Sequence, residues 1–235
     1  RTAIARRLFP DRAQFAGPIR DAAMRRAAWF DFLFVDFGIL RLFWKNFARV
    51  GSKGLAVRMN QPYPSDLAKA AQNGIRTVVT ARHDPRHGGH ALEAEACERL
   101  GLAYVTFPLF SRAAPSRESL LAAQDFFASI EMPVLIHCKS GADRAGLLSA
   151  LYLIVTEGVP VREARLQLSL RFLHFSASST GILDAVFEAY LAAHPDEAKP
   201  FLDWVREDYD PAALTAAFRS RAFWDFIDRR VLHRE

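Results

Sequence analysis

From about residue 47 onward, short apolar runs alternate along the chain with longer stretches whose apolar positions recur at helical spacing. The short runs predict strands at residues 47–50, 55–59, 75–81, 103–109 and 133–137. The longer stretches predict helices at residues 64–73, 91–100 and 115–130, one that follows residue 144 and runs to 156, one that begins at 160, and one at 181–193. Strands separated by helices are typical of a mostly parallel sheet. We therefore expect an α/β fold whose central sheet is flanked by helices on both faces.

The chain has 235 residues, of which 51% are hydrophobic, enough to bury a full core. We expect a main domain at residues 47–195, preceded by a basic amphipathic helical extension at 1–46 and followed by a docked helical tail at 196–235. The tail is charged, but its aromatic residues argue for docked helices rather than disorder. These aromatic residues are Phe201, Trp204, Tyr209, Phe218, Phe223, Trp224 and Phe226.

Residues 29–44, WFDFLFVDFGILRLFW, are the most apolar stretch of the chain. This stretch is short for a membrane span and contains three charged residues, so we do not expect it to cross a membrane. On a helical wheel its polar side continues beyond residue 44 and opposes the aromatic side, which predicts an amphipathic helix, broken or kinked near Asp36-Phe37-Gly38. Two placements remain open: the apolar face packs on the main domain, or it lies in a membrane interface. Asp36 is expected to cap the helix junction, although it could reach the active site. The polar side consists of Asp31, Gly38, Arg41, Lys45, Asn46 and Arg49.

The net charge of +5 comes from 31 basic and 26 acidic side chains and is unevenly distributed. Residues 1–50 hold ten Lys/Arg and four Asp/Glu, a net charge of +6, whereas residues 51–235 are close to neutral. A basic extension suits peripheral contact with a membrane surface, and no recognition motif for nucleic acid accompanies it, so no nucleic acid is expected as a partner. The two cysteines and the lack of a signal-peptide pattern predict a reducing cytoplasmic location.

Residues 134–146, VLIHCKSGADRAG, combine an anion-binding loop with a nucleophile. An apolar strand ends before Cys138, the chain turns through Gly141, and Arg144 opens an apolar helix. The amides of a tight loop at a helix N-terminus attract a phosphate-sized anion, and the same field favours the thiolate of Cys138. The guanidinium of Arg144 can bind two oxygens of one phosphoryl group.

The sequence HCKSGADR resembles the His-Cys-five residues-Arg signature of the cysteine-dependent protein tyrosine and dual-specificity phosphatases. Its position after a late strand is similar to that in the dual-specificity branch. The resemblance implies that Cys138 attacks phosphorus to form a phosphocysteine, which water then hydrolyses, with no metal and no other cofactor. The implied substrate is a phosphorylated protein, at phosphotyrosine or phosphoserine, or a lipid or inositol phosphate. The resemblance also implies substrate binding by Lys139, Ser140, Gly141, Ala142, Asp143 and Arg144, and a supporting role for His137.

The chain departs from the family pattern at three places. The loop at residues 108–115, where the family usually places a general-acid Asp, holds no carboxylate. Ala145 stands where the family usually has a Ser or Thr that helps the cysteine to leave, and no counterpart is found for the glutamine that positions water in classical members. Asp143 is our hypothesis for the acid. A role for Asp143 as a brace for Arg144, and Asp84 as the acid, remain open alternatives.

These departures leave a second interpretation: a catalytically weak or inactive phosphate-binding module that recognises phosphorylated or lipid partners. Lys139 directly after Cys138 is similar to the loop of the tensin-type phosphoinositide phosphatases, and a second cation there favours multiply charged or lipid phosphates. Cys97 is expected in the core, while a protective disulfide with Cys138 stays open. Three histidines share a stretch with Pro85, whose spacing predicts a rim of the active site rather than a metal site: His83, His87 and His90.

Overall fold

The computed structural model describes residues 12–219, and the chain divides into two compact units. The domain division expected from the sequence, with a main domain at 47–195, follows different limits and remains a prediction. The first unit combines Arg1–Leu109 with Ile130–Ala145, and the second combines Phe110–Ser129 with Gly146–Glu235.

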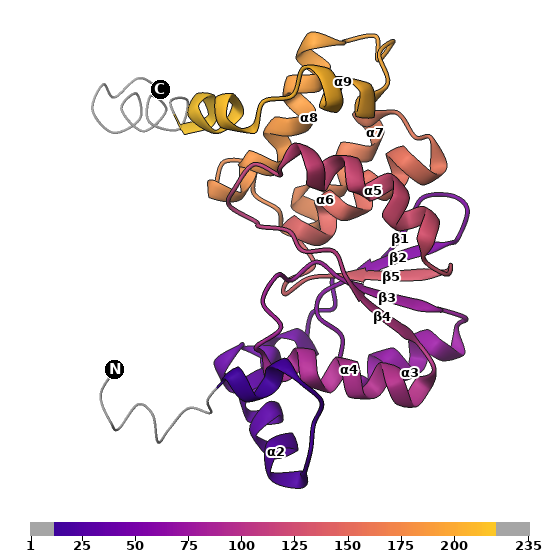
Figure 1. The fold of residues 1–235 in the computed structure, drawn as a ribbon, viewed down its shortest axis with the longest axis vertical. Helices are drawn as coiled ribbons and strands as arrows, with labels where there is room; N and C mark the ends of the chain where they lie inside the picture. Colours follow the sequence, from indigo (N-terminus) through magenta and orange to yellow (C-terminus); the bar gives the residue numbers. More distant parts are fainter. Residues whose placement is uncertain (1–11, 220–235) are drawn as a thin grey trace. The chain divides into compact units, whose positions relative to one another are not determined.

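Within residues 12–219, five strands of the first unit form one sheet in the order β1-β2-β5-β3-β4 (Figure 1). They are β1 (Ala48–Val50), β2 (Ala56–Met59), β3 (Thr77–Thr80), β4 (Ala103–Thr106) and β5 (Val134–His137). Neighbouring strands are parallel except β1 with β2. The prediction of a mostly parallel α/β sheet is confirmed. His137 at the end of β5 pairs with Met59 of β2 and Thr80 of β3, so these three strands end at one edge of the sheet.

Helices α3 (Pro64–Gln72) and α4 (Gly88–Leu100) pack on one face of this sheet (Figure 1). Because strand side chains alternate between faces, residues such as Val78 and Leu135 point into this layer together. Cys97 of α4 is fully buried there, as the sequence predicts, and burial raises the pKa of its thiol to about 12. Both cysteines are free. Cys97 therefore behaves as a small apolar core residue.

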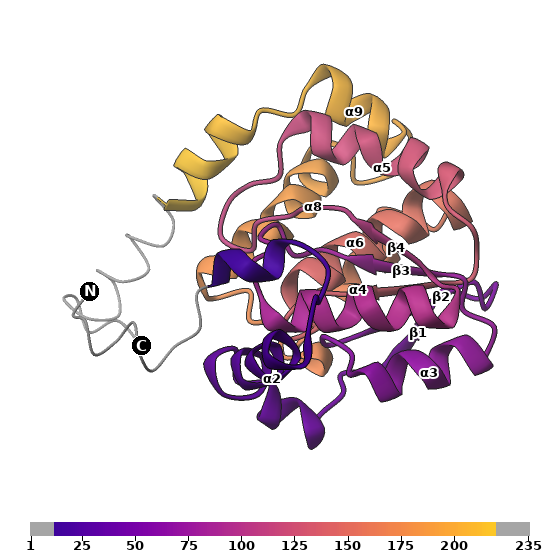
Figure 2. The same cartoon turned by 60° about the horizontal axis from the view of Figure 1, so that its bottom comes forward.

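The chain before the sheet folds onto α4. It contains η1 (Arg12–Ala16), α2 (Ala22–Phe30), η2 (Asp31–Val35) and η3 (Gly38–Leu42). Helix α2 lies beside α4 (Figure 2). The carboxylate of Asp21 caps α2 by accepting a hydrogen bond from the amide of Met24 at 2.7 Å. Met24, Ala28 and Phe32 are buried in a cluster that includes Tyr63. No helix among residues 12–219 is long and apolar enough to cross a membrane.

The predicted break near Asp36-Phe37-Gly38 is confirmed. The amide of Asp36 closes the last helical turn by donating to the carbonyl of Asp31 at 2.8 Å. Phe37 then takes a left-handed conformation with φ 56°, and η3 begins at Gly38. A Cβ atom at Gly38 would lie 2.4 Å from the carbonyl oxygen of Phe32, so only glycine fits this close approach.

The orientation of the segment after this break excludes one of the two placements left open by the sequence, in which its apolar face packs on the domain. Asp36, Arg41 and Asn46 are buried, whereas Leu40 and Phe43 are 63% and 89% exposed. Apolar side chains are buried upstream, in α2 and at Phe32. From residue 34 to residue 43 the large apolar side chains are mostly exposed, and polar side chains are buried instead. The physical reason is that the polar side chains have partners around the loop that follows β5.

The second unit is helical throughout its described part. Its elements are α5 (Arg117–Ser129), most of α6 (Asp143–Tyr152), η4 (Leu153–Glu157), α7 (Val161–Ala164), η5 (Arg165–Gln167), η6 (Leu170–Phe172), η7 (Ser179–Gly181), α8 (Ile182–Ala193) and α9 (Phe201–Glu207), and residues 211–219 are also helical. Tyr190 of α8 packs edge-on against Phe201 and Trp204, and Trp204 contacts Tyr209. Arg117 of α5 donates to the carbonyl of Tyr209 at 2.5 Å. Residues 201–209 thus pack within the second unit, while the docked tail expected at 196–235 remains a prediction, and Phe223, Trp224 and Phe226 lie outside the described residues.

Candidate active site

Residues 138–142 form a tight loop between β5 and α6, at the edge where the central strands end. The sequence predicts this loop, and its turn depends on Gly141, whose φ is 75°. A Cβ atom at Gly141 would lie 2.6 Å from the amide nitrogen of Asn60 and 2.7 Å from the carbonyl carbon of Met59. Any side chain here would therefore push the loop away from the end of β2.

Four consecutive carbonyl groups of the loop are bound by donors from other parts of the first unit. The donors are the guanidinium groups of two arginines, the side-chain amide of an asparagine and one backbone amide, all of them far from the loop in sequence. The carbonyl of Lys139 accepts from the amide of Gln61 at 3.2 Å and from Arg41 at 3.4 Å, that of Ser140 from Asn46 at 3.1 Å, and those of Gly141 and Ala142 from Arg58 at 2.6 and 3.0 Å.

This arrangement aims the amides of the loop. In a planar trans peptide the carbonyl and the following N–H point in opposite directions. With the carbonyls of residues 139–142 turned toward their donors, the N–H groups of residues 140–143 face the other side of the loop. There the amide of Gly141 lies 3.3 Å from the Sγ atom of Cys138. The amide of Ala142 lies 3.4 Å from the hydroxyl oxygen of Ser140. The loop thus places one amide donor at the sulfur and turns its neighbours toward the same side, as an oxyanion site requires.

Arg58 is the main supporting residue that sequence reasoning missed. It is fully buried in β2, where an arginine has a large desolvation cost, and its guanidinium binds two loop carbonyls. The available signal was a single arginine within the apolar strand run at residues 55–59. Sequence pattern alone does not show whether such an arginine points to solvent or to a buried acceptor.

His137 ends β5, Cys138 follows it, and Arg144 stands at the start of α6. Cys138 is buried at the end of β5, and Arg144 occupies the first turn of α6. Among the residues that the structure describes, the buried Nε atom of Arg144 has no hydrogen-bond partner, so it is available to an anion. The Nδ1 atom of His137 lies 3.3 Å from the carbonyl oxygen of Cys138. Burial lowers the pKa of His137 to about 3, so its ring is neutral at neutral pH.

Asp36 of the N-terminal segment reaches the loop, besides ending the helix as expected. Its carboxylate receives a two-point contact from Arg82, at 2.8 and 3.2 Å, and lies 2.9 Å from Arg41 and 3.1 Å from the Nζ atom of Lys139. Burial alone would raise the pKa of Asp36, but the hydrogen bond from Arg82 and the charges of Arg82, Arg41 and Lys139 outweigh it and hold this pKa below its ordinary value. The ammonium of Lys139 is thus held beside a carboxylate, with the ring of Phe37 5.8 Å away.

A second buried carboxylate, Glu93 of α4, lies behind His137. The hydroxyl of Tyr104 donates to Glu93 at 2.6 Å, and the Nε2 atom of His137 is 3.7 Å from the other carboxyl oxygen. Burial raises the pKa of Glu93 to about 8, against the hydrogen bond from Tyr104 and the charge of Arg82. Glu93 is therefore mostly protonated at neutral pH. No sequence signal separated it from the other glutamates of its helix.

The two acid candidates have different surroundings. Asp143 is the first residue of α6 and belongs to the loop itself. Asp84 is bound by Arg86 of its own loop, at 2.9 Å from the guanidinium and 3.0 Å from the amide, and the hydrogen bond from Arg86 lowers the pKa of Asp84 to about 2. A carboxyl group that stays ionised is a poor proton donor. The pairing of Asp84 with Arg86 thus disfavours Asp84 as the acid and favours Asp143.

The histidine stretch does not gather into a metal site in the described part of the chain, where no three His, Cys, Asp or Glu side chains cluster for a metal ion. His87 precedes α4, and burial lowers its pKa to about 4. His90 lies 3.0 Å from the hydroxyl of Tyr104. His90 thus contacts the tyrosine that also binds Glu93.

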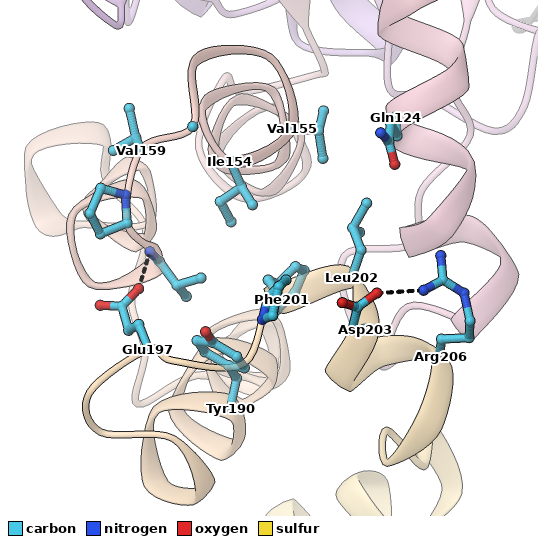
Figure 3. A pocket seen from close by; sticks show the side chains of 14 residues that line it. Gln124, Ile154, Val155, Val159, Tyr190, Glu197, Phe201, Leu202, Asp203 and Arg206 are labelled. Atoms are coloured by element: carbon cyan, nitrogen blue, oxygen red, sulfur yellow. Dashed lines mark hydrogen bonds and ion pairs between the residues drawn. The ribbon is translucent and has the colours of Figure 1, made fainter.

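A surface cavity of about 510 Å³ lies in the second unit and contains no residue of the loop (Figure 3). Its charged side chains are already paired. Asp203 and Arg206 lie 2.6 Å apart, and Glu197 accepts a hydrogen bond from the amide of Val161 at 2.6 Å. Nothing in this lining resembles the anion site of the first unit.

Comparison with known proteins extends these observations. Residues 48–152 match the family model of the phosphatase-like domain of beta-lactamase hydrolase-like proteins. Beta-lactamase hydrolase-like proteins of two Xylella fastidiosa strains, Temecula1 and 9a5c, are each 35% identical over 94 residues, 39% of this chain and 21% of theirs. This chain therefore covers about a fifth of the length of those relatives.

Two solved structures are similar in fold. The active form of Tk-PTP has a TM-score of 0.49 and 20% identity, covering 62% of this chain and 98% of that one. TpbA of P. aeruginosa has a TM-score of 0.45 and 18% identity, covering 74% of this chain and 97% of that one.

Proposed function

We propose that residues 48–152, which match the family model of a phosphatase-like domain, act as a cysteine-dependent phosphatase of the tyrosine and dual-specificity type and hydrolyse phosphomonoesters through a phosphocysteine on Cys138. The observation that carries the proposal is the anchoring of four consecutive loop carbonyls, together with the amide of Gly141 that lies 3.3 Å from the cysteine sulfur. Such a cradle matches the equatorial oxygens of a phosphoryl group.

In the first step the thiolate of Cys138 attacks phosphorus while the bond to the leaving oxygen breaks. Asp143 donates its proton to that oxygen, so the alcohol leaves neutral. The loop amides and Arg144 bind the three equatorial oxygens, and the guanidinium holds two of them at once. The products of this step are the alcohol and a phosphocysteine.

In the second step a water molecule attacks the phosphocysteine. Its proton passes to the carboxylate of Asp143, the sulfur–phosphorus bond breaks, and inorganic phosphate and the thiolate of Cys138 are released. Ala145 offers no hydroxyl to stabilise the departing sulfur. We therefore expect this step to be slow, with the phosphocysteine accumulating during turnover.

The substrate class has two candidates, a phosphorylated protein and a lipid or inositol phosphate. The second is supported by Lys139 at the edge of the loop and by the basic extension. A cytoplasmic setting with peripheral membrane contact is consistent with both. A panel of phosphotyrosine and phosphoserine peptides, inositol phosphates and phosphatidylglycerophosphate separates these candidates by their relative kcat/KM.

The second candidate function, a phosphate-binding module without turnover, is favoured by Ala145 and by the missing carboxylate at residues 108–115. Hydrolysis of an aryl phosphate by the wild type, by Cys138→Ser and by the matched variant Cys97→Ser decides between them. The enzyme requires activity that Cys138→Ser abolishes and Cys97→Ser retains, after correction for folded protein. Phosphate binding without hydrolysis in the wild type would establish the module instead.

The role of Asp143 is tested by its Asn variant on substrates with good and poor leaving groups. The proposal expects a large rate loss only with the poor leaving group and loss of the pH dependence that this acid creates. An equal loss with both leaving groups would instead show that Asp143 braces Arg144.

A further inference from the structure

Residues 34–47 expose six large apolar side chains beside the phosphate loop. Each is more than half exposed, and the set, called here the apolar strip, lies within 14 residues of sequence. Monomeric proteins scatter such residues singly, so a local concentration marks an interaction surface. The strip consists of Phe34, Phe37, Leu40, Leu42, Phe43 and Phe47.

The strip cannot turn inward without breaking the active site. Asp36, Arg41 and Asn46 are buried, alternate with its members along the chain, and each contacts the loop backbone or the side chain of Lys139. Reversing the segment would leave Asp36 and the arginines around it without their partners, at a large desolvation cost. The contacts that build the phosphate loop therefore hold the apolar side chains in solvent.

The charge of the segment that carries the strip has one dominant sign. In the sequence, exposed basic residues lie before and after the strip, at Arg20, Arg26 and Arg49. In residues 12–50 the acidic side chains are Asp21, Asp31 and Asp36. Asp31 and Asp36 are buried in ion pairs, and Asp21 caps α2. The outer surface of the segment thus combines aromatic and aliphatic groups with positive charge.

We propose that the apolar strip docks on an anionic lipid bilayer. Aromatic and aliphatic side chains enter the boundary between headgroups and acyl chains, while flanking arginines bind anionic headgroups. Since Phe37 lies beside Lys139, docking brings the edge of the loop to the headgroup layer. The consequence that the loop then receives a lipid phosphate rests on the proposed function, whereas the docking does not.

The test is flotation of the full chain with vesicles of phosphatidylcholine alone or mixed with phosphatidylglycerol. The wild type is expected to bind the mixed vesicles, more weakly as salt is raised, and the neutral vesicles poorly. The double variant Leu40→Ser, Phe43→Ser removes two exposed members of the strip, and we expect at least about a tenfold loss of binding. Its matched control is Leu166→Ser, Leu170→Ser, at positions of the second unit that are 61% and 67% exposed. The control is expected to bind like the wild type.

Each other outcome overturns the proposal. Absence of wild-type binding to the mixed vesicles does so, as does an equal loss of binding in the two double variants. Self-association that Leu40→Ser, Phe43→Ser abolishes would identify a second copy of this chain as the occupant. Aryl phosphate hydrolysis separates docking from the proposed function: Cys138→Ser is expected to bind vesicles normally without hydrolysis, and Leu40→Ser, Phe43→Ser to hydrolyse normally without binding.

Discussion

Residues 138–144 and residues 36–46 contact each other at one edge of the sheet. The first segment supplies the groups of the proposed chemistry, and the second supplies side chains that bind the first. In the loop, the amide of Gly141 faces the cysteine sulfur, and two side chains, Cys138 and Arg144, carry the proposed chemistry. In the N-terminal segment, the side chains of Arg41 and Asn46 bind the loop's carbonyls, and Asp36 binds Lys139. This difference shows that the conformation of a loop of small residues depends on hydrogen-bond donors outside the loop.

This comparison predicts that changes in the loop act mainly on kcat, and the largest effect is expected at Arg144. Arg144→Lys keeps the charge but loses the two-point contact with the phosphoryl oxygens. We expect kcat to fall by about 1000-fold, which corresponds to about 4 kcal/mol. Steady-state kinetics with an aryl phosphate measure the effect. Arg76→Lys, an exposed position of the same unit, is the control, and a loss below tenfold at Arg144 would contradict the proposed mechanism.

Changes in the N-terminal segment are expected to act first on stability. Asp36→Asn leaves three cations without their carboxylate, and we expect a loss of about 3 kcal/mol in the free energy of unfolding in urea. The lowered pKa of Asp36 means that this contribution is present above its ordinary pKa of 3.8 and is lost as the pH falls below it. The matched control is Asp84→Asn, in an exposed pair with Arg86, where about 0.5 kcal/mol or less is expected. Equal losses of unfolding free energy in the two variants would show that Asp36 contributes no more than the carboxylate of an exposed pair.

Glu93 extends the comparison to a buried carboxyl group on which burial outweighs the charges of Arg82 and Arg41. Its pKa, raised from 4.5 to about 8, means that the folded state retains a proton which the unfolded state loses above pH 4.5. Wild-type stability therefore decreases as the pH rises through this window, by about 1.4 kcal/mol per pH unit from this group. Glu93→Gln removes the titration. Between pH 6 and pH 7.5 we expect the variant to gain about 2 kcal/mol relative to the wild type. A pH-independent difference in unfolding free energy would show that Glu93 is ionised in the fold.

The smallest effect is expected at Asn46, which binds one loop carbonyl. Asn46 has a positive φ of 48°, so Asn46→Gly removes the amide without straining the backbone. We expect a loss of about 1 kcal/mol in stability and a few-fold lower kcat/KM. Asn73→Gly removes a similar bond to the carbonyl of Lys69 at an exposed helix end and is expected to leave kcat/KM unchanged. Unchanged kinetics at Asn46 would show that the loop holds its shape without this donor.

Prediction from the sequence succeeded where neighbouring residues decide the structure. The strands ending at Met59 and His137, the turn at Gly141 and the break before Gly38 all follow from residues within a few positions of one another. For residues 29–44 the sequence left two placements of the apolar face open, and only the structure showed that this face is exposed from residue 34 to residue 43. A helical wheel separates polar from apolar faces, but it does not show which face meets buried partners.

The supporting residues were not predictable for the same reason. Arg58 lies 83 positions from Gly141, Asn46 lies 94 positions from Ser140, and Arg41 lies 98 positions from Lys139. Nothing local to Arg58 marks it as a buried donor, because its acceptors are backbone carbonyls, which every residue has. The same holds for Glu93, whose protonation depends on burial beside Tyr104.

The sequence by itself determined the parallel arrangement of the strands, the place of Cys138 at the end of β5 and the small residues that let the chain turn there, because each depends on local spacing. Only the tertiary structure decided which way the loop's amides point, which face of the N-terminal segment is exposed, and which of two buried carboxyl groups is charged. Each of these depends on hydrogen-bond donors and charges that are many tens of residues apart in the sequence. Folding brings these groups together, and the pattern of residues along the chain does not show which of them meet.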